Sequence, residues 1–152
     1  MEETAKIEKA LIEIPFGLIE YTAFFQNPIV RAFSPPTELI EVLFSALKPH
    51  GFLIDGVETK NTTKVSDYTV EFRRTAPEIT FSVTPGKLVV SANNLSWDDK
   101  KQFLEIVGSG TDALFETARV KFESQSLILA MHVQLKNKPR QEITAPLLSP
   151  AA

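Results

Sequence analysis

The stretch that decides the fold runs from Val65 to Asn93 and has the sequence VSDYTVEFRRTAPEITFSVTPGKLVVSAN. Apolar and polar residues alternate in three successive runs, which is the period of strands with one buried and one solvated face. Between the second and third runs, Thr84-Pro85-Gly86-Lys87 has Pro and Gly where a tight turn prefers them. We therefore predict an antiparallel meander. Its expected buried side chains are Tyr68, Val70, Phe72, Ile79, Phe81, Val83, Leu88 and Val90.

A helix is predicted before this meander, over residues 36–48. Pro36 is tolerated in a first helical turn, and Pro49 and Gly51 end the segment. Its apolar side chains recur at helical spacing and form one stripe. The stripe consists of Leu39, Ile40, Leu43, Phe44 and Leu47.

A second helix is predicted after the meander, with Ser96 as its cap and Asp99 three residues later, as in a capping box. Two glycines, Gly108 and Gly110, cost roughly 2 kcal/mol in a helix interior. Either the helix breaks there, or the small residues let it cross the sheet closely; one helix with a kink or weak point is favoured. Its expected apolar face consists of Leu104, Val107, Leu114, Phe115 and Ala118.

Three further strands are predicted outside the meander, at residues 16–25, 52–60 and 120–136. The first is apolar on both faces, which suits a strand covered on both sides or used in oligomerisation. The third is longer than an ordinary strand, so a bulge or bend is expected at residues 123–126. Residues 2–14 fit a helix or a strand, and residues 137–152 are expected to be an irregular tail.

Together these segments predict a single α+β domain over residues 1–136, in the order strand, helix, four strands, helix, strand. The expected architecture is a two-layer sandwich, with a curved antiparallel sheet of about six strands and two helices on one face. This element order resembles that of the TATA-binding-protein-like and helix-grip folds. It differs from them by the long strand after the second helix, and no functional residues carry over from the resemblance.

The composition limits the classes of partner. The chain has 152 residues, a formal net charge of −3 and no cysteine. This charge gives no electrostatic basis for binding nucleic acid or an anionic membrane. No segment has the run of about 18 apolar residues that a spanning helix needs, and the first residues are acidic where a signal peptide is basic. We expect a cytoplasmic protein that binds neither nucleic acid nor membrane.

Residues with reactive side chains form no recognisable site, so no catalytic residue, cofactor or metal is predicted. The two histidines, His50 and His132, have no acidic neighbour at a metal-ligand spacing. Arg73 and Arg74 are adjacent in a strand and point to opposite faces, so they cannot grip one phosphate together. Arg74 falls on the apolar parity, where its charged end is expected to reach out to solvent.

The high content of apolar aromatic residues, with eleven Phe, is the one sequence feature that suggests a function. Candidate residues for an apolar pocket or interface are Tyr21, Phe24, Phe25, Phe33, Phe103 and Phe115. The favoured hypothesis is a non-enzymatic binding or assembly module that forms homo-oligomers, with residues 16–25 or 127–136 pairing at a free sheet edge. The alternative is a carrier or enzyme that holds a small apolar molecule between the long helix and the sheet.

Overall fold

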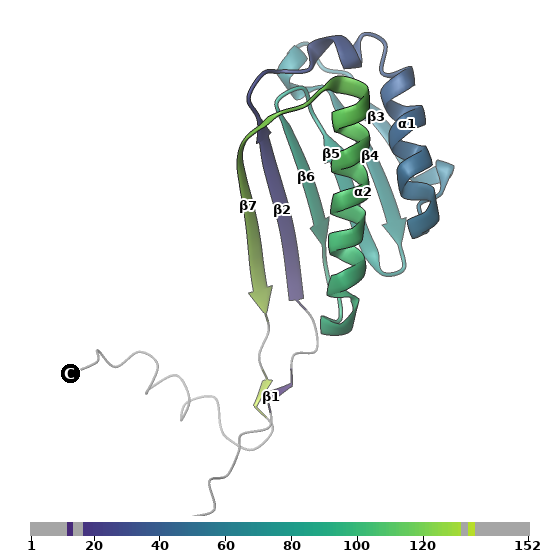
Figure 1. Ribbon diagram of the computed structural model, residues 1–152. Helices are drawn as coiled ribbons and strands as arrows, with labels where there is room; N and C mark the ends of the chain where they lie inside the picture. The colour runs from purple at the N-terminus through teal and green to yellow at the C-terminus, as the bar shows by residue number, and fades with distance from the viewer. Residues whose placement is uncertain (1–11, 14–16, 132–133, 136–152) are drawn as a thin grey trace, which may run out of the picture.

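The computed structural model describes residues 12–13, 17–131 and 134–135. Its main feature is an open six-stranded antiparallel sheet with the strand order β3-β4-β5-β6-β2-β7 (Figure 1). The strands are β2 (Gly17–Phe25), β3 (Val57–Lys60), β4 (Thr69–Thr75), β5 (Glu78–Val83), β6 (Lys87–Ala92) and β7 (Phe122–Met131).

Two helices, α1 (Thr37–Leu47) and α2 (Lys100–Ala118), pack side by side on one face of this sheet (Figure 1). The predicted order of strand, helix, four strands, helix and strand is confirmed, and so is the α+β class. The first helix buries Leu39, Leu43 and Leu47, as its apolar stripe predicts. The division into a domain of residues 1–136 and a tail of residues 137–152 stays a prediction, because the tail lies outside the described residues.

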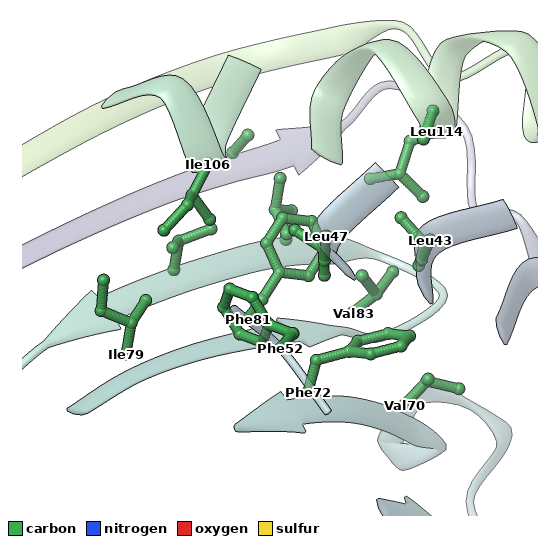
Figure 2. Close-up of a cluster of buried hydrophobic side chains, with 14 of the residues drawn as sticks. Leu43, Leu47, Phe52, Val70, Phe72, Ile79, Phe81, Val83, Ile106 and Leu114 are labelled. Atoms are coloured by element: carbon green, nitrogen blue, oxygen red, sulfur yellow. The ribbon is translucent and has the colours of Figure 1, made fainter. Parts of the chain in front are cut away.

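The predicted meander forms the centre of the sheet as β4, β5 and β6. Its alternation is confirmed, because every second side chain from Val70 to Ala92 within these strands is buried. Figure 2 shows five of these side chains with Leu43 and Leu47 of α1 and Ile106 and Leu114 of α2; the five are Val70, Phe72, Ile79, Phe81 and Val83. The core therefore lies between the meander and the two helices.

The second helix continues without interruption through both glycines. At Gly110 the helix lies against the sheet, because a Cβ atom added there would be 2.1 Å from Cε2 of Phe81. Of the two alternatives for this segment, the close crossing is the one observed. The helix is continuous and not broken at this point, because Gly110 has no side chain to collide with the ring of Phe81.

The apolar face predicted for α2 is partly wrong. Leu114 is buried, but Leu104 and Phe115 are exposed, and the side facing the core is lined by Phe103, Ile106, Gly110, Ala113 and Leu114. The predicted cap is confirmed only for a shorter element: Ser96 is the N-cap of a 3₁₀ turn that runs directly into α2, its hydroxyl donates to the Asp99 carboxylate, and Asp99 is the N-cap of α2 itself. A 3₁₀ turn at Trp97–Asp99 precedes the helix.

The outer strands differ from their predicted bounds. The segment predicted at residues 52–60 is a strand only from Val57, because Ile54–Gly56 forms a 3₁₀ turn. The long last strand has the expected bulge: Phe24 pairs with Ser124 and Phe25 with Phe122, which leaves an extra residue on β7.

A two-stranded ribbon is formed by β1 (Ile12–Glu13) and β8 (Gln134–Leu135), so the predicted last strand is divided between β7 and β8. Within the ambiguous residues 2–14, Ile12–Glu13 is strand, and the structure describes none of the others. His132 also lies outside the described residues.

Candidate interaction surface

The open edge of the sheet at β7 is the main candidate for a functional surface. This ten-residue strand pairs with β2 on one side and with no described strand on the other. Three successive apolar side chains are half exposed there, namely Leu127 (51%), Ile128 (51%) and Leu129 (49%). Apolar residues that lie on both faces of an unpaired edge form a template for association.

The pairing with β2 assigns these three side chains to the two faces of the sheet. Leu127 and Leu129 pair with Tyr21 and Ile19, whose side chains belong to the core on the helix side, so both leucines face the helix layer. Ile128 pairs with Glu20 and faces the opposite, outer side. Neither of the two helices in the described part of the chain covers β7 (Figure 1). The helix layer therefore ends before this strand, which leaves its helix-side face bare.

The neighbouring helix α2 carries two exposed apolar side chains, Leu104 and Phe115. Ser109, Asp112, Ala113 and Glu116 of α2 line a cavity together with α1, which identifies the side of α2 that faces the other helix. With about 100° between successive helical residues, Leu104 and Phe115 lie roughly 120° and 140° round the helix from Gly110, which faces the sheet, so both point mainly outward. Their side chains are 57% and 55% exposed. The exposed apolar side chains of α2 therefore lie on the outward side of the helix layer, and those of β7 lie on the sheet edge itself.

The other open edge of the sheet is protected. It is formed by β3, which has only four residues and includes the charged side chains Glu58 and Lys60. Short, charged edges are a common means of preventing association between sheets. By contrast, residues 124–131 of β7 contain no charged residue, no Pro and no Gly. The two edges are therefore chemically different, and only β7 is suited to pairing with another strand.

The six predicted site residues do not meet in one pocket. Phe25, Phe33 and Phe103 are core residues, and Phe25 stacks on Phe122 with 6.1 Å between ring centroids. Phe24 is exposed on the outer face of β2, Tyr21 lies on the helix side beside β7, and Phe115 is exposed on α2. The interface role predicted for this set stays a prediction, and the structure places only Tyr21, Phe24 and Phe115 where a partner has access.

Sequence reasoning missed Leu104, which it placed in the core, and it gave no separate weight to Leu127, Ile128 and Leu129. The available signal was the uninterrupted apolar triplet, because a strand with one buried face alternates. The prediction that residues 16–25 form a free edge is wrong, since β2 lies between β6 and β7. The second predicted edge, in residues 127–136, is the one observed as far as β7 extends.

Tyr21 joins the two strands beside the bare surface. Its phenolic hydroxyl donates a hydrogen bond of 2.7 Å to Oε1 of Gln125 on β7. Burial raises the pKa of the Tyr21 hydroxyl, because its charged form is poorly solvated there. The side chain therefore serves as a neutral donor that holds β7 to β2 at neutral pH.

Arg74 has a structural role at the opposite end of the meander, and the prediction that it reaches out to solvent is wrong. The side chain is only 7% exposed. Its guanidinium donates to the carbonyl oxygens of His50 and Pro77 and to Oε1 of Gln102, at 2.7, 3.2 and 3.3 Å. Burial lowers the pKa of Arg74, and the negative charge of Asp99 opposes that shift. The residue ties the end of α1 and the β4–β5 turn to the first turns of α2.

Within residues 17–131, the remaining polar groups give no arrangement typical of catalysis. His50 shares a hydrogen bond of 2.9 Å between its Nε2 and Oγ of Ser109, but Ser109 lies within a continuous helix whose backbone N–H groups are already paired. Among the residues that the structure describes, no group of three His, Cys, Asp or Glu side chains is placed to hold a metal ion. No helix in the described ranges is long and apolar enough to cross a membrane.

The seam between the long helix and the sheet is closely packed at its crossing point. Phe81, Phe103, Ile106 and Leu114 have no exposed surface, and Gly110 lies directly against the Phe81 ring. Cavities of about 770 and 600 Å³ lie at the ends of the helix layer, and one of about 680 Å³ lies between α1 and α2. A search of family models finds no match to this chain, and neither does a search of curated proteins.

Proposed function

We propose that this chain is a non-enzymatic assembly module that forms a homodimer by antiparallel pairing of β7 with β7 of a second copy. The observation that carries this proposal is the open edge of β7, with Leu127, Ile128 and Leu129 each about half exposed. Pairing satisfies the free backbone groups of the edge and buries apolar side chains on both faces at once. A cytoplasmic location remains part of the same prediction.

A second copy is the partner favoured by the chemistry of the strand. An antiparallel pair of identical strands has two-fold symmetry, and closed two-fold dimers are the commonest homo-oligomers. Because residues 124–131 are uncharged, the strand meets its own copy without repulsion of like charges. The protected β3 edge then stops the sheet from extending further, so pairing ends at a dimer.

The alternative function, in which a small apolar molecule lies between the long helix and the sheet, has less support. It needs space at the seam where Gly110 and Phe81 are in contact. The bare face of β7 offers apolar surface without any such rearrangement. We therefore favour assembly over transport or catalysis.

Size-exclusion chromatography with light scattering tests the proposal. We expect a mass of twice 16.9 kDa, with dissociation only on dilution. A chain that stays monomeric at high protein concentration contradicts the proposal.

A further inference from the structure

A cavity of about 600 Å³ lies where the end of α1 meets the β4–β5 turn and the start of α2. Its lining includes His50 and Gly51 after α1, Arg74 and Thr75 of β4, and Gln102 of α2. This volume is in the range of sites that hold small molecules, roughly 300–1,000 Å³. The cavity is formed within one chain, so an inference from it does not depend on the proposed dimer.

The cation beside this cavity is buried without an ion pair. Arg74 is only 7% exposed, and its guanidinium donates to two carbonyl oxygens and to the neutral amide of Gln102. Within residues 17–131 no carboxylate forms an ion pair with it, and Asp99 attracts it only from a longer distance. A buried charge is costly unless an opposite charge accompanies it. An anion in the cavity would supply that opposite charge.

Arg74 and its neighbours have donors left for such an anion. A guanidinium has five N–H groups, and three of them are used in the bonds to His50, Pro77 and Gln102. The amide oxygen of Gln102 accepts one of these bonds, so the amide nitrogen of the same side chain remains a donor. Gly51 has no side chain to cover Arg74, since a Cβ atom there would be 3.4 Å from Cδ of Arg74. Donors of this kind suit a carboxylate, which a guanidinium binds through paired hydrogen bonds.

The other residues around the cavity favour an anion with one charge and an apolar chain. Arg73 also lines the cavity, but its guanidinium is paired with Glu71 at 2.9 Å. The Asp55 carboxylate lies in the lining and repels a phosphate dianion more strongly than a monoanion. Leu53 lines the cavity as well and is 70% exposed. It therefore offers apolar surface to a hydrocarbon chain.

We propose that this cavity binds a small organic acid, with its carboxylate at the guanidinium of Arg74 and its apolar chain against Leu53. The carboxylate neutralises the buried cation, and the amide group of Gln102 helps to orient it. This ligand site is a property of the single chain and goes beyond the assembly function.

Nuclear magnetic resonance of the Arg74 Nε–H group tests the inference, with the full chain and sodium hexanoate as the probe. One control is hexanamide, which has the same chain length without the charge. The other is hexyl phosphate, which is largely a dianion at neutral pH. We expect hexanoate to shift the Nε–H resonance saturably, with both controls at least about 10-fold weaker because neither matches the single charge.

Variants that add one negative charge separate binding at Arg74 from a general effect of charge. Gln102→Glu places a carboxylate at the position of the amide oxygen, 3.3 Å from Nη2 of Arg74. It should neutralise the cation within the chain and weaken hexanoate binding at least about 10-fold. Gln26→Glu adds the same charge at an exposed residue of a different cavity and should leave binding unchanged.

A third variant tests the apolar part of the site. Leu53→Ser should weaken the binding of hexanoate but not that of acetate, because only hexanoate has a chain that reaches Leu53. Since Leu53 is 70% exposed, this variant keeps the test decisive even if Gln102→Glu does not fold, which circular dichroism checks.

Four results would overturn the inference. The first is a Nε–H resonance that hexanoate does not shift, and the second is equal binding of hexanamide, which would make the site purely apolar. The third is tighter binding of hexyl phosphate, which would make it a phosphate site. The fourth is a folded Gln102→Glu variant that binds hexanoate as wild type does, because the anion would then lie away from Arg74.

Discussion

Gly110 of α2 lies directly over the ring of Phe81 on β5, so close that a Cβ atom on Gly110 would be 2.1 Å from Cε2 of that ring. The ring has no exposed surface, so it cannot be displaced without moving its buried neighbours. A second glycine of the same helix, Gly108, has no atom within 4 Å of the corresponding position. The two glycines thus have opposite roles, although they are only two residues apart.

Alanine substitutions at these glycines should have opposite effects on stability. Gly108→Ala should stabilise the fold by about 0.5–1 kcal/mol, because Ala favours a helix more than Gly does. Gly110→Ala should destabilise it by about 1–3 kcal/mol, because the methyl group overpacks the core. Urea unfolding followed by circular dichroism measures both changes. Equal effects of the two substitutions would show that α2 does not approach the sheet at Gly110.

Two adjacent arginines provide a second matched comparison. Arg74→Met should lower the free energy of unfolding by roughly 2–4 kcal/mol, since it leaves the carbonyl groups of His50 and Pro77 without their donor. Arg73→Met removes only an exposed 2.9 Å ion pair with Glu71, for which we expect less than about 1 kcal/mol. Thermal and urea denaturation measure both losses. A larger loss at Arg73 would contradict the buried position of Arg74.

Tyr21 makes the stability of the fold sensitive to alkaline pH. Its pKa is raised in the folded state, so its contribution is complete below the unfolded pKa of about 10 and is lost as pH rises through the folded value. At pH 8, Tyr21→Phe should cost about 0.5–1.5 kcal/mol through the lost hydrogen bond to Gln125. The difference between wild type and Tyr21→Phe should shrink above pH 10. Urea unfolding at both pH values measures it, with Tyr68→Phe as the control; a constant difference would contradict the assignment.

The sequence predicts the centre of this fold well because the meander depends on local patterns. A strand with one buried face must alternate, and the Pro-Gly pair at residues 85–86 predicts a turn, so β4, β5 and β6 follow directly. In the structure Gly86 does not adopt a positive φ, so the turn itself does not require glycine there. The same reasoning fails where contacts between residues far apart in the chain determine the position of a strand. The position of β2 between β6 and β7 depends on pairing with a strand about a hundred residues later, which no local pattern specifies.

The candidate surface was harder to predict for a related reason. On α2, the buried face is centred on Gly110, and a glycine contributes nothing to an apolar pattern. The apolar pattern therefore placed the buried face on the side of Leu104 and Phe115, whereas both of these side chains are exposed. The inward position of Arg74 follows from alternation, but its acceptor at His50 is 24 residues away in the chain. Local sequence carries no information about such a partner.

The most direct test of the assembly proposal is a charge exchange at Ile128, which lies near the middle of the uncharged segment of β7. Ile128→Lys and Ile128→Glu each place two like charges close to the proposed two-fold axis, so each variant alone should be monomeric where wild type is dimeric. Leu53→Lys, at an exposed apolar residue outside the sheet, is the control and should remain dimeric.

Light scattering and native mass spectrometry of an equimolar mixture of the two Ile128 variants give the decisive measurement. The proposal predicts that the mixture regains the dimeric mass as a complex containing one chain of each variant, because opposite charges then meet across the paired strands. A mixture that stays monomeric while wild type is dimeric, or variants that dimerise as wild type does, would contradict pairing through β7.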